Sequence, residues 1–374
     1  MSPTICLATK DTLRWPKAAG HFWVFLNWAL GLRALGCRVL WLERVTPDFR
    51  ADEIPNLILD LRRRLEAYGL KNCLALSWET EASVASDAFD GCLTLEEARE
   101  ADLLLNLAYD IPVVGFFRRS AFVDIDPGLT QIWIDVYDMK IARHDTYFTI
   151  GETVGQAGAL FPDCGLQWHY TPPPVHLSIW PPSTAPSTAA FTTVMNWWGG
   201  WMEYKGEAYD NGKRAGFLQF LDLPRRTTKP LELAICLADN TGDREMLCKY
   251  GWRVQEAWHV TSTPWDYQRY IQNSLGEFSC VKPSCVRLQN AWISDRTLCY
   301  LASGKPVVVQ HTGPSRFLPD RSGLFRFRDI DEAAQCLDAV ATDYNRQCRL
   351  ARDLAEKHFD AKVVVSRVLE KALD

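Results

Sequence analysis

"GHFWVFLNWALGLRALGCRVLWLE" (residues 20–43) is the stretch that decides the fold. Its apolar residues recur at helical spacing, and Gly36 stands where such a helix would end. "RVLWLE" (38–43) then has the composition of a buried strand, as does "TICLAT" (4–9) ahead of the helix. A strand, a helix and a second strand in this order form the unit of a parallel sheet with helices on its faces.

The same rhythm continues on both sides of a proline-rich segment. "LEEAREADLLLNL" (95–107) predicts a helix followed by a strand in the first half. "TPPPVHLSIWPPSTAP" (171–186) holds six prolines, which exclude a helix or a central strand. We therefore expect one α/β domain over residues 1–175, a second over 176–350 and C-terminal helices over 351–374. Two such domains joined by a hinge place a deep cleft at their junction, where ligands prefer to bind.

The composition is that of a globular protein with two domains. A net charge of -5 and a pI near 5.9 argue against nucleic acid as the main partner. No apolar stretch approaches the ~20 residues of a transmembrane helix, and the N-terminus lacks a secretory pattern. We therefore expect a cytoplasmic protein that does not insert into a membrane. Twelve cysteines are scattered with no CxxC pair, which favours buried thiols over disulfides or a zinc site.

"SDRTLCYLASGKPVVVQHTG" (294–313) predicts a helix, a stop at Gly304 and a strand. Ser294 suits the N-cap, and Asp295 is favourable in the first turn. The free N–H groups of that turn, at the positive end of the helix dipole, form an anion site. Thr297 can add a hydroxyl and Arg296 a charged fork for phosphate oxygens, both from the polar side of the helix. An ordinary capped helix is the alternative.

This segment resembles the donor-binding segment of GT-B glycosyltransferases, and residues 20–43 are similar to the opening of the same superfamily. The resemblance implies two Rossmann-like α/β domains that face each other across a cleft, with the last helix crossing back to the first domain. It also implies that the predicted helix receives the diphosphate of a nucleotide sugar. A histidine in the first loop, here His21, is implied to be a general base or a phosphate contact. An ordinary helix-start histidine is the alternative.

The sequence departs from the family pattern at two positions. Many retaining members carry two glutamates, with seven residues between them, before the turn that holds Gly304. The corresponding residues are Ala291 and Cys299, so the carboxylate expected to hold the ribose is absent. This departure weakens a retaining mechanism, and we expect inversion.

Two carboxylates follow a predicted strand in "DIDPG" (124–128). Alternate positions on a strand share a face, so Asp124 and Asp126 could both point into the cleft. A metal site is one interpretation. The proline–glycine turn favours turn-forming and acceptor-facing roles, and we take Asp126 with His21 as the catalytic candidates. Thr149 and Glu152 in "FTIGET" (148–153) are further acceptor-side candidates.

Three more residues are candidates for donor binding. In "NWWGG" (196–200), Gly199 would allow the backbone to approach a ligand, and Trp198 could stack on a base or sugar. A buried tryptophan beside a turn is the alternative. Lys282, just before Pro283, could pair with phosphate or lie on the surface.

The sequence thus predicts a glycosyltransferase that uses a nucleotide sugar as co-substrate and needs neither metal nor cofactor. The acceptor is unknown, and the aromatic first half suggests a flat or apolar one. No P-loop or GxGxxG fingerprint is present. A sugar-nucleotide epimerase of the same fold and a non-catalytic nucleotide-sugar-binding protein remain open.

Overall fold

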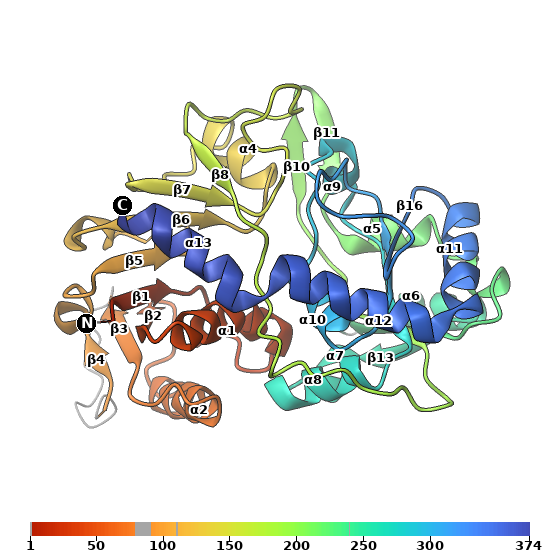
Figure 1. Ribbon diagram of the computed structural model, residues 1–374, viewed down its shortest axis with the longest axis horizontal. Coiled ribbons are helices and arrows are strands. Elements are labelled where there is room, and N and C mark those ends of the chain that lie inside the picture. Colours follow the sequence, from red (N-terminus) through yellow and green to blue (C-terminus); the bar gives the residue numbers. More distant parts are fainter. Residues whose placement is uncertain (1, 79–90, 110, 239) are drawn as a thin grey trace.

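The apolar runs of the sequence form the strands of two parallel sheets, one in each half of the chain (Figure 1). The structure is a computed structural model and describes residues 2–78, 91–109, 111–238 and 240–374. Helices cover the faces of both sheets, so the central strands are buried on both sides and are mostly apolar. The predicted fold, α/β with two Rossmann-like domains, is confirmed.

The first sheet has eight parallel strands in the order β4-β3-β2-β1-β5-β6-β7-β8. The order reverses beside β1, which pairs with β2 on one side and β5 on the other. The strands are β1 (Thr4–Ala8), β2 (Arg38–Val45), β3 (Leu74–Trp78), β4 (Leu93–Thr94), β5 (Leu103–Asn106), β6 (Ser120–Asp124), β7 (Thr146–Thr149) and β8 (Trp168–Tyr170). The helices here are α1 (Ala19–Ala34), α2 (Ile54–Ala67), α3 (Leu95–Ala98) and α4 (Leu129–Asp135).

The second sheet has six parallel strands in the order β13-β12-β9-β14-β15-β16. The order reverses here as well, between β9 and β14. The strands are β9 (Phe191–Asn196), β12 (Leu231–Cys236), β13 (Arg253–Glu256), β14 (Gly276–Ser279), β15 (Val307–Gln310) and β16 (Leu324–Phe327). The helices are α5 (Lys213–Leu218), α6 (Thr241–Lys249), α7 (Ala257–Val260), α8 (Pro264–Gln272), α9 (Pro283–Leu288), α10 (Asp295–Ala302), α11 (Ile330–Thr342) and α12 (Tyr344–Leu354).

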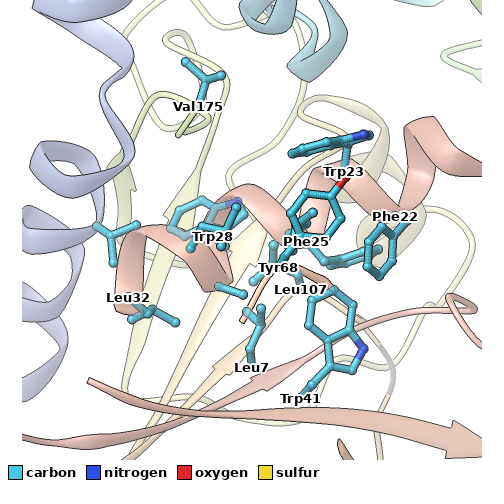
Figure 2. Packing of buried hydrophobic residues seen from close by; sticks show 14 of the residues in the cluster. Leu7, Phe22, Trp23, Phe25, Trp28, Leu32, Trp41, Tyr68, Leu107 and Val175 are labelled. Carbon is cyan, nitrogen blue, oxygen red and sulfur yellow. The ribbon is translucent and has the colours of Figure 1, made fainter. Parts of the chain in front are cut away.

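Helix α1 is buried almost all round, because it lies between the first sheet, the second domain and the C-terminal helix. Figure 2 shows two of its aromatic side chains, Phe22 and Phe25, beside Trp41 of β2. Trp23 also contacts Trp180 of the proline-rich segment, with ring centroids 4.7 Å apart. On the other side, Gly31 leaves room for α13 (Ala361–Leu373), since a Cβ there would lie 2.8 Å from Val365.

Helices α12 and α13 run one after the other across the two domains (Figure 1). They are separated by a bend at residues 355–360, and the proline-rich segment is fixed there. Val175 N–H donates to Phe359 O at 2.8 Å, and Ala361 N–H donates to Val175 O at 3.0 Å. The segment that links the domains is therefore held on the helix that spans them.

A two-stranded hairpin, β10 (Trp201–Tyr204) and β11 (Glu207–Asp210), is inserted between β9 and α5. It leaves the second domain and packs against the first, where Met202 and Tyr209 join a cluster with Phe122 and Leu129. The hydroxyl of Tyr137 bonds to the backbone of the hairpin as well. The hairpin thus bridges the domains beside α4 (Figure 1).

Two expectations about composition can be compared with the structure. All twelve cysteines are free thiols, and seven of them are buried. Among the described residues, no helix is both long and apolar enough to span a bilayer.

Candidate functional site

The reversals of strand order in the two sheets lie on either side of one interdomain cavity. In open α/β sheets, ligands bind at the carboxyl ends of the strands beside such a reversal. The cavity measures about 510 Å³ and has walls from both domains. Its lining from the first domain is Trp15, Lys17, Ala18, Ala19, Gly20, His21 and Val24; from the second it is Val194, Met195, Asn196, Cys236, Ala257, Trp258, Thr261, Tyr267, Ser294, Asp295 and Arg296.

The N-terminus of α10 opens into this cavity. Ser294 occupies the N-cap position, and its side chain makes no capping hydrogen bond to a described residue. The first N–H groups of a helix have no partner within the helix, so those of α10 are available to a ligand. Asp295 also lines the cavity, and burial raises the pKa of its carboxyl to about 6. The helix end therefore offers backbone donors beside one acidic side chain.

Arg296 does not extend from the polar side of α10 as expected. The whole stretch from Arg296 to Ala302 is buried, because the first domain packs against the helix. The guanidinium lies between β9 and β14, which pair only at their first residues. It donates to Glu277 at 2.7 Å, to Val194 O at 3.0 Å and to Ser279 Oγ at 2.7 Å. Arg296 thus bridges the diverging strands and presents only an edge to the cavity.

Arg296→Ala is expected to destabilise the fold. Glu277 is fully buried, and the substitution would leave its carboxylate without a cation. Breaking a buried ion pair from one side costs roughly 3–5 kcal/mol, which lowers the melting temperature on the order of 10 °C. Arg296→Met with Glu277→Leu should recover much of the loss, since no charge stays buried. An unchanged melting temperature for Arg296→Ala would show that the pair does not support the strands.

Lys213 is the cation that the sequence analysis missed. It begins α5, immediately after the hairpin, and makes no hydrogen bond or close ion pair with any described residue. Burial lowers the pKa of Lys213 to about 7, and the nearby charges of Arg296 and Lys282 add to the decrease. Positive charges that lie close together repel one another. An anion bound among them would reduce this repulsion and would therefore be stabilised. The sequence pattern did not place Lys213 near the site, because the inserted hairpin separates it from β9.

Lys282 lies across the domain junction from Asp126. Its ammonium is 3.5 Å from the Asp126 carboxylate, which also accepts a hydrogen bond from Tyr109 at 3.0 Å. Asp126 raises the pKa of Lys282 and keeps it charged. Asp126 also acts electrostatically on His21 and Asp295. Asp126 therefore lies close to these groups without lining the cavity, and Lys282 holds it to the second domain.

His21 stands in the first turn of α1 and lines the cavity. Its Nε2 is 2.5 Å from the carbonyl oxygen of Lys10. A carbonyl only accepts, so Nε2 carries the proton and Nδ1 keeps its lone pair. Burial lowers the pKa of His21, so the ring is neutral near pH 7. The ring also contacts Trp15 and Phe25 edge-on, which fixes its plane. A neutral imidazole with one free nitrogen can accept a proton.

Asp124 and Thr149 do not face the cleft. Asp124 is fully buried and accepts hydrogen bonds from Thr130 at 2.6 Å, Gln131 at 2.9 Å and Thr149 at 2.8 Å. These donors use the carboxylate to close the turn between β6 and α4. Asp124 therefore has the turn-forming role that was one part of its expectation, and Thr149, an acceptor-side candidate, donates one of its hydrogen bonds. The acceptor-facing role expected of both is not what the structure shows.

Glu152 is likewise engaged elsewhere. Its carboxylate accepts hydrogen bonds from Ser315 Oγ and from Arg316 N–H, the latter at 2.8 Å, both in the second domain. The side chain is only 3% exposed. Glu152 therefore joins the two domains outside the lining of the interdomain cavity, and its carboxylate is engaged by the second domain.

Trp198 and Gly199 lie at the base of the hairpin, outside the lining of the large cavity. A Cβ on Gly199 would come within 2.4 Å of Asn211 O, so the glycine allows two backbone segments of the hairpin to meet. A close approach was expected, but its partner is the chain itself. Trp198 is 44% exposed instead of lining the donor cavity.

The structure also gives the positions of the remaining residues discussed from the sequence. Thr297 is buried and lines a small cavity of about 30 Å³ beside α10, together with Ser294 and Arg296. Ala291 and Cys299, at the positions of the missing glutamates, are both buried. Within the described part of the chain, no group of three or more His, Cys, Asp or Glu side chains is placed to hold a metal ion.

The two-domain fold of the chain is similar to that of solved proteins. No family model matches the sequence, and no curated protein matches it. HepE from Anabaena, in complex with UDP-glucose, superposes over 99% of both chains with a TM-score of 0.60 and 13% identity. An α-glucosyltransferase in complex with UDP-glucose and DNA containing an abasic site covers 100% of both chains, with a TM-score of 0.58 and 12% identity.

This chain has the GT-B fold. The resemblance inferred from residues 20–43 and 294–313 is confirmed at that level. The GT-B fold extends over the whole chain, and the cavity with α10 on one side and His21 on the other lies between its two domains.

Proposed function

We propose that the protein is a glycosyltransferase that moves a sugar from a nucleoside diphosphate donor to an acceptor hydroxyl. One observation carries the proposal. The cavity between the two strand reversals combines the free N–H groups of α10 with a neutral histidine from the opposite domain. Both structural relatives were solved with UDP-glucose, which makes UDP-glucose the first donor to test.

The diphosphate would bind between three positive groups, one helix end and two lysines. The α10 N-terminus supplies backbone donors, and Lys213 and Lys282 supply cations. Preorganised donors of this kind stabilise the charge that develops on a leaving diphosphate. We therefore propose that transfer needs no metal ion and no further cofactor.

His21 would act as the general base. As the acceptor oxygen bonds to the anomeric carbon, its proton passes to Nδ1 of His21. The bond between the anomeric carbon and the phosphate oxygen breaks, and its electron pair leaves on the diphosphate. A base that acts on the side of the sugar opposite the diphosphate produces inversion. Asp126 is close enough to act on the imidazolium through its charge, which favours the proton transfer.

The acceptor would dock at the mouth of the cleft beside the hairpin. Large aromatic side chains are exposed on the hairpin and beside it, namely Tyr137, Trp198 and Trp201. Trp201 is 73% exposed. Flat aromatic side chains of this kind stack on rings. The acceptor is therefore proposed to carry a flat or apolar group. That nucleic acid is not the acceptor stays a prediction, since one relative was solved with DNA.

Trp201→Ala should raise the KM for the acceptor by about two- to tenfold, because one stacking contact is worth roughly 0.5–1.5 kcal/mol. The affinity for the nucleoside diphosphate should not change. Trp265→Ala serves as the control, since Trp265 is also exposed but stacks on Tyr68 at the opposite side of the molecule. The acceptor KM is measured for both variants. An equal effect of the two substitutions would remove the hairpin from acceptor binding.

Incubation with a panel of nucleotide sugars in the presence of EDTA tests the proposed function. Slow release of the nucleoside diphosphate, and faster release once an acceptor is present, is the expected result. Conversion of the donor to an isomer would show an epimerase. Binding without any turnover would show a nucleotide-sugar-binding protein. Activity that returns only with Mg²⁺ or Mn²⁺ would refute the metal-independent part.

A further inference from the structure

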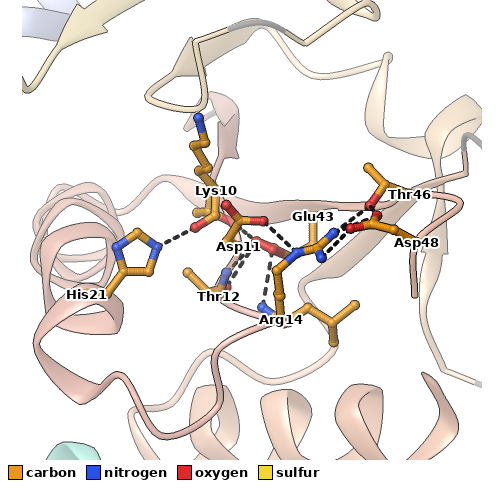
Figure 3. A network of polar contacts seen from close by, with 10 residues as sticks. Lys10, Asp11, Thr12, Arg14, His21, Glu43, Thr46 and Asp48 are labelled. Carbon is orange, nitrogen blue, oxygen red and sulfur yellow. Dashed lines mark hydrogen bonds and ion pairs between the residues drawn. The ribbon is translucent and has the colours of Figure 1, made fainter. Parts of the chain in front are cut away.

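A buried polar cluster lies behind His21 and outside the cavity (Figure 3). Its centre is Glu43, on β2, which is only 1% exposed. The carboxylate accepts hydrogen bonds from Thr9 Oγ1 at 3.0 Å, Thr12 N–H at 3.0 Å and Thr12 Oγ1 at 3.2 Å. Leu13 N–H adds a longer contact of 3.4 Å. All the donors come from one loop, between β1 and α1.

The same loop holds the proposed base. Lys10 lies between Thr9 and Thr12, and its carbonyl oxygen accepts the hydrogen bond from His21 Nε2. Figure 3 shows Glu43 and His21 on opposite sides of this loop. The position of one carbonyl group thus depends on hydrogen bonds made to a carboxylate that does not itself touch the ring.

The loop would not hold this shape without such bonds. Asp11 has φ 56°, in the left-handed region that residues with a side chain seldom adopt. Further bonds converge on Thr12, whose carbonyl accepts from Arg64 at 3.2 Å and whose hydroxyl accepts from Trp41 at 3.3 Å. Burying a carboxylate is costly unless donors surround it, and here four contacts do so. The cluster is therefore built to fix the backbone of the loop.

We infer that Glu43 is a positioning residue for His21. Its carboxylate fixes the loop so that the Lys10 carbonyl holds the proton on Nε2 and leaves Nδ1 directed to an acceptor. The inference rests on the proposed function only in giving His21 a catalytic role. The placement of the ring and of its proton is independent of that role.

Glu43→Leu is the sharpest variant, because it keeps the approximate size of the side chain and removes both acceptor oxygens. A glutamine would be a weaker test, since Thr9 and Thr12 donate only to Oε1, which the amide oxygen can replace. With ¹⁵N-labelled histidine, the wild-type His21 signals should show the tautomer with its proton on Nε2. In Glu43→Leu, the signals should move toward a mixture of tautomers. Turnover should fall by up to about a hundredfold, and the Kd for UDP should change less than about twofold.

Asp48→Asn is the matched control. Asp48 pairs with Arg14 at the outer side of the same loop, so the variant also replaces a carboxylate with a neutral side chain there. It leaves the four contacts of Glu43 in place, and both the tautomer and turnover should stay as in the wild type.

A folded Glu43→Leu protein with an unchanged His21 tautomer would overturn the inference. A changed tautomer with unchanged turnover would support the positioning role and instead refute His21 as the base. If Glu43→Leu does not fold, Thr12→Val removes one hydroxyl donor and keeps the carboxylate. A smaller shift toward mixed tautomers is expected from it, and no shift would again overturn the inference.

Discussion

His21→Ala is expected to lower turnover by roughly 10²–10⁴-fold, with little change in the affinity for a nucleoside diphosphate. The structure gives the physical reason. His21 lines the interdomain cavity, its Nε2 proton is held by the Lys10 carbonyl, and its Nδ1 is left as an acceptor. Removing the ring removes the proton acceptor and leaves the cations and helix end that face the diphosphate.

The pH dependence supplies a second readout for His21. Burial lowers the pKa of the ring, and a base must be neutral to accept a proton. Turnover should therefore be full near pH 7 and fall on the acid side, below the ordinary histidine value of about 6.5. His21→Ala should lose this acid limb together with most of the activity. His169→Ala, at the far edge of the first sheet, is the control and should behave as the wild type. Loss of UDP binding in His21→Ala would reassign the ring to phosphate contact.

Lys213→Ala is expected to weaken nucleoside diphosphate binding by about ten- to a hundredfold, since a hydrogen bond to a charged group is worth roughly 1.5–3 kcal/mol. Binding of the bare nucleoside should change little. Lys249→Ala, an exposed lysine at the end of α6, is the matched control and should leave both affinities unchanged. Calorimetric titration of each variant with both ligands gives the comparison. Equal losses for the nucleoside and the diphosphate would mean that Lys213 acts through the fold.

Proton uptake gives an independent test of the same lysine. The pKa of Lys213 is lowered to about 7 in the free protein, so about half of it is uncharged at neutral pH. A bound diphosphate would favour the charged form and raise the pKa. Binding should therefore take up protons near pH 7 to 8, and affinity should fall as the pH rises through this range. Titrations in buffers of different ionisation enthalpy measure the uptake. Lys213→Ala should abolish it.

The fold was predictable because its strands are short apolar runs in a regular order. The stretch at residues 20–43 contains a helix and a strand of the first sheet, and the structure places both there. The N-terminus of α10 was predictable for the same reason, since its cap, its first turn and its glycine stop are local features. These local sequence features therefore predicted one element of the site, the N-terminus of α10.

The directions of side chains were not predictable, because their partners are distant in the sequence. Arg296 turns inward to Glu277 on another strand, and Glu152 joins a loop of the opposite domain. Asp124 is enclosed by donors from α4 and β7. Lys213 follows a hairpin, and the fold brings it close to the charges of Arg296 and Lys282. In each of these cases, the helix or strand pattern of the sequence does not indicate which distant residue the side chain will contact.

The central claim is that the cavity binds a diphosphate through α10, Lys213 and Lys282. Calorimetric titration of the wild-type protein with UDP and with uridine, both in EDTA, tests it most directly. Two or more charge-assisted bonds to the diphosphate, each worth roughly 1.5–3 kcal/mol, predict that UDP binds at least about a hundredfold more tightly than uridine. Equal affinities for the two ligands, or UDP binding that appears only when a divalent cation is added, would contradict the account.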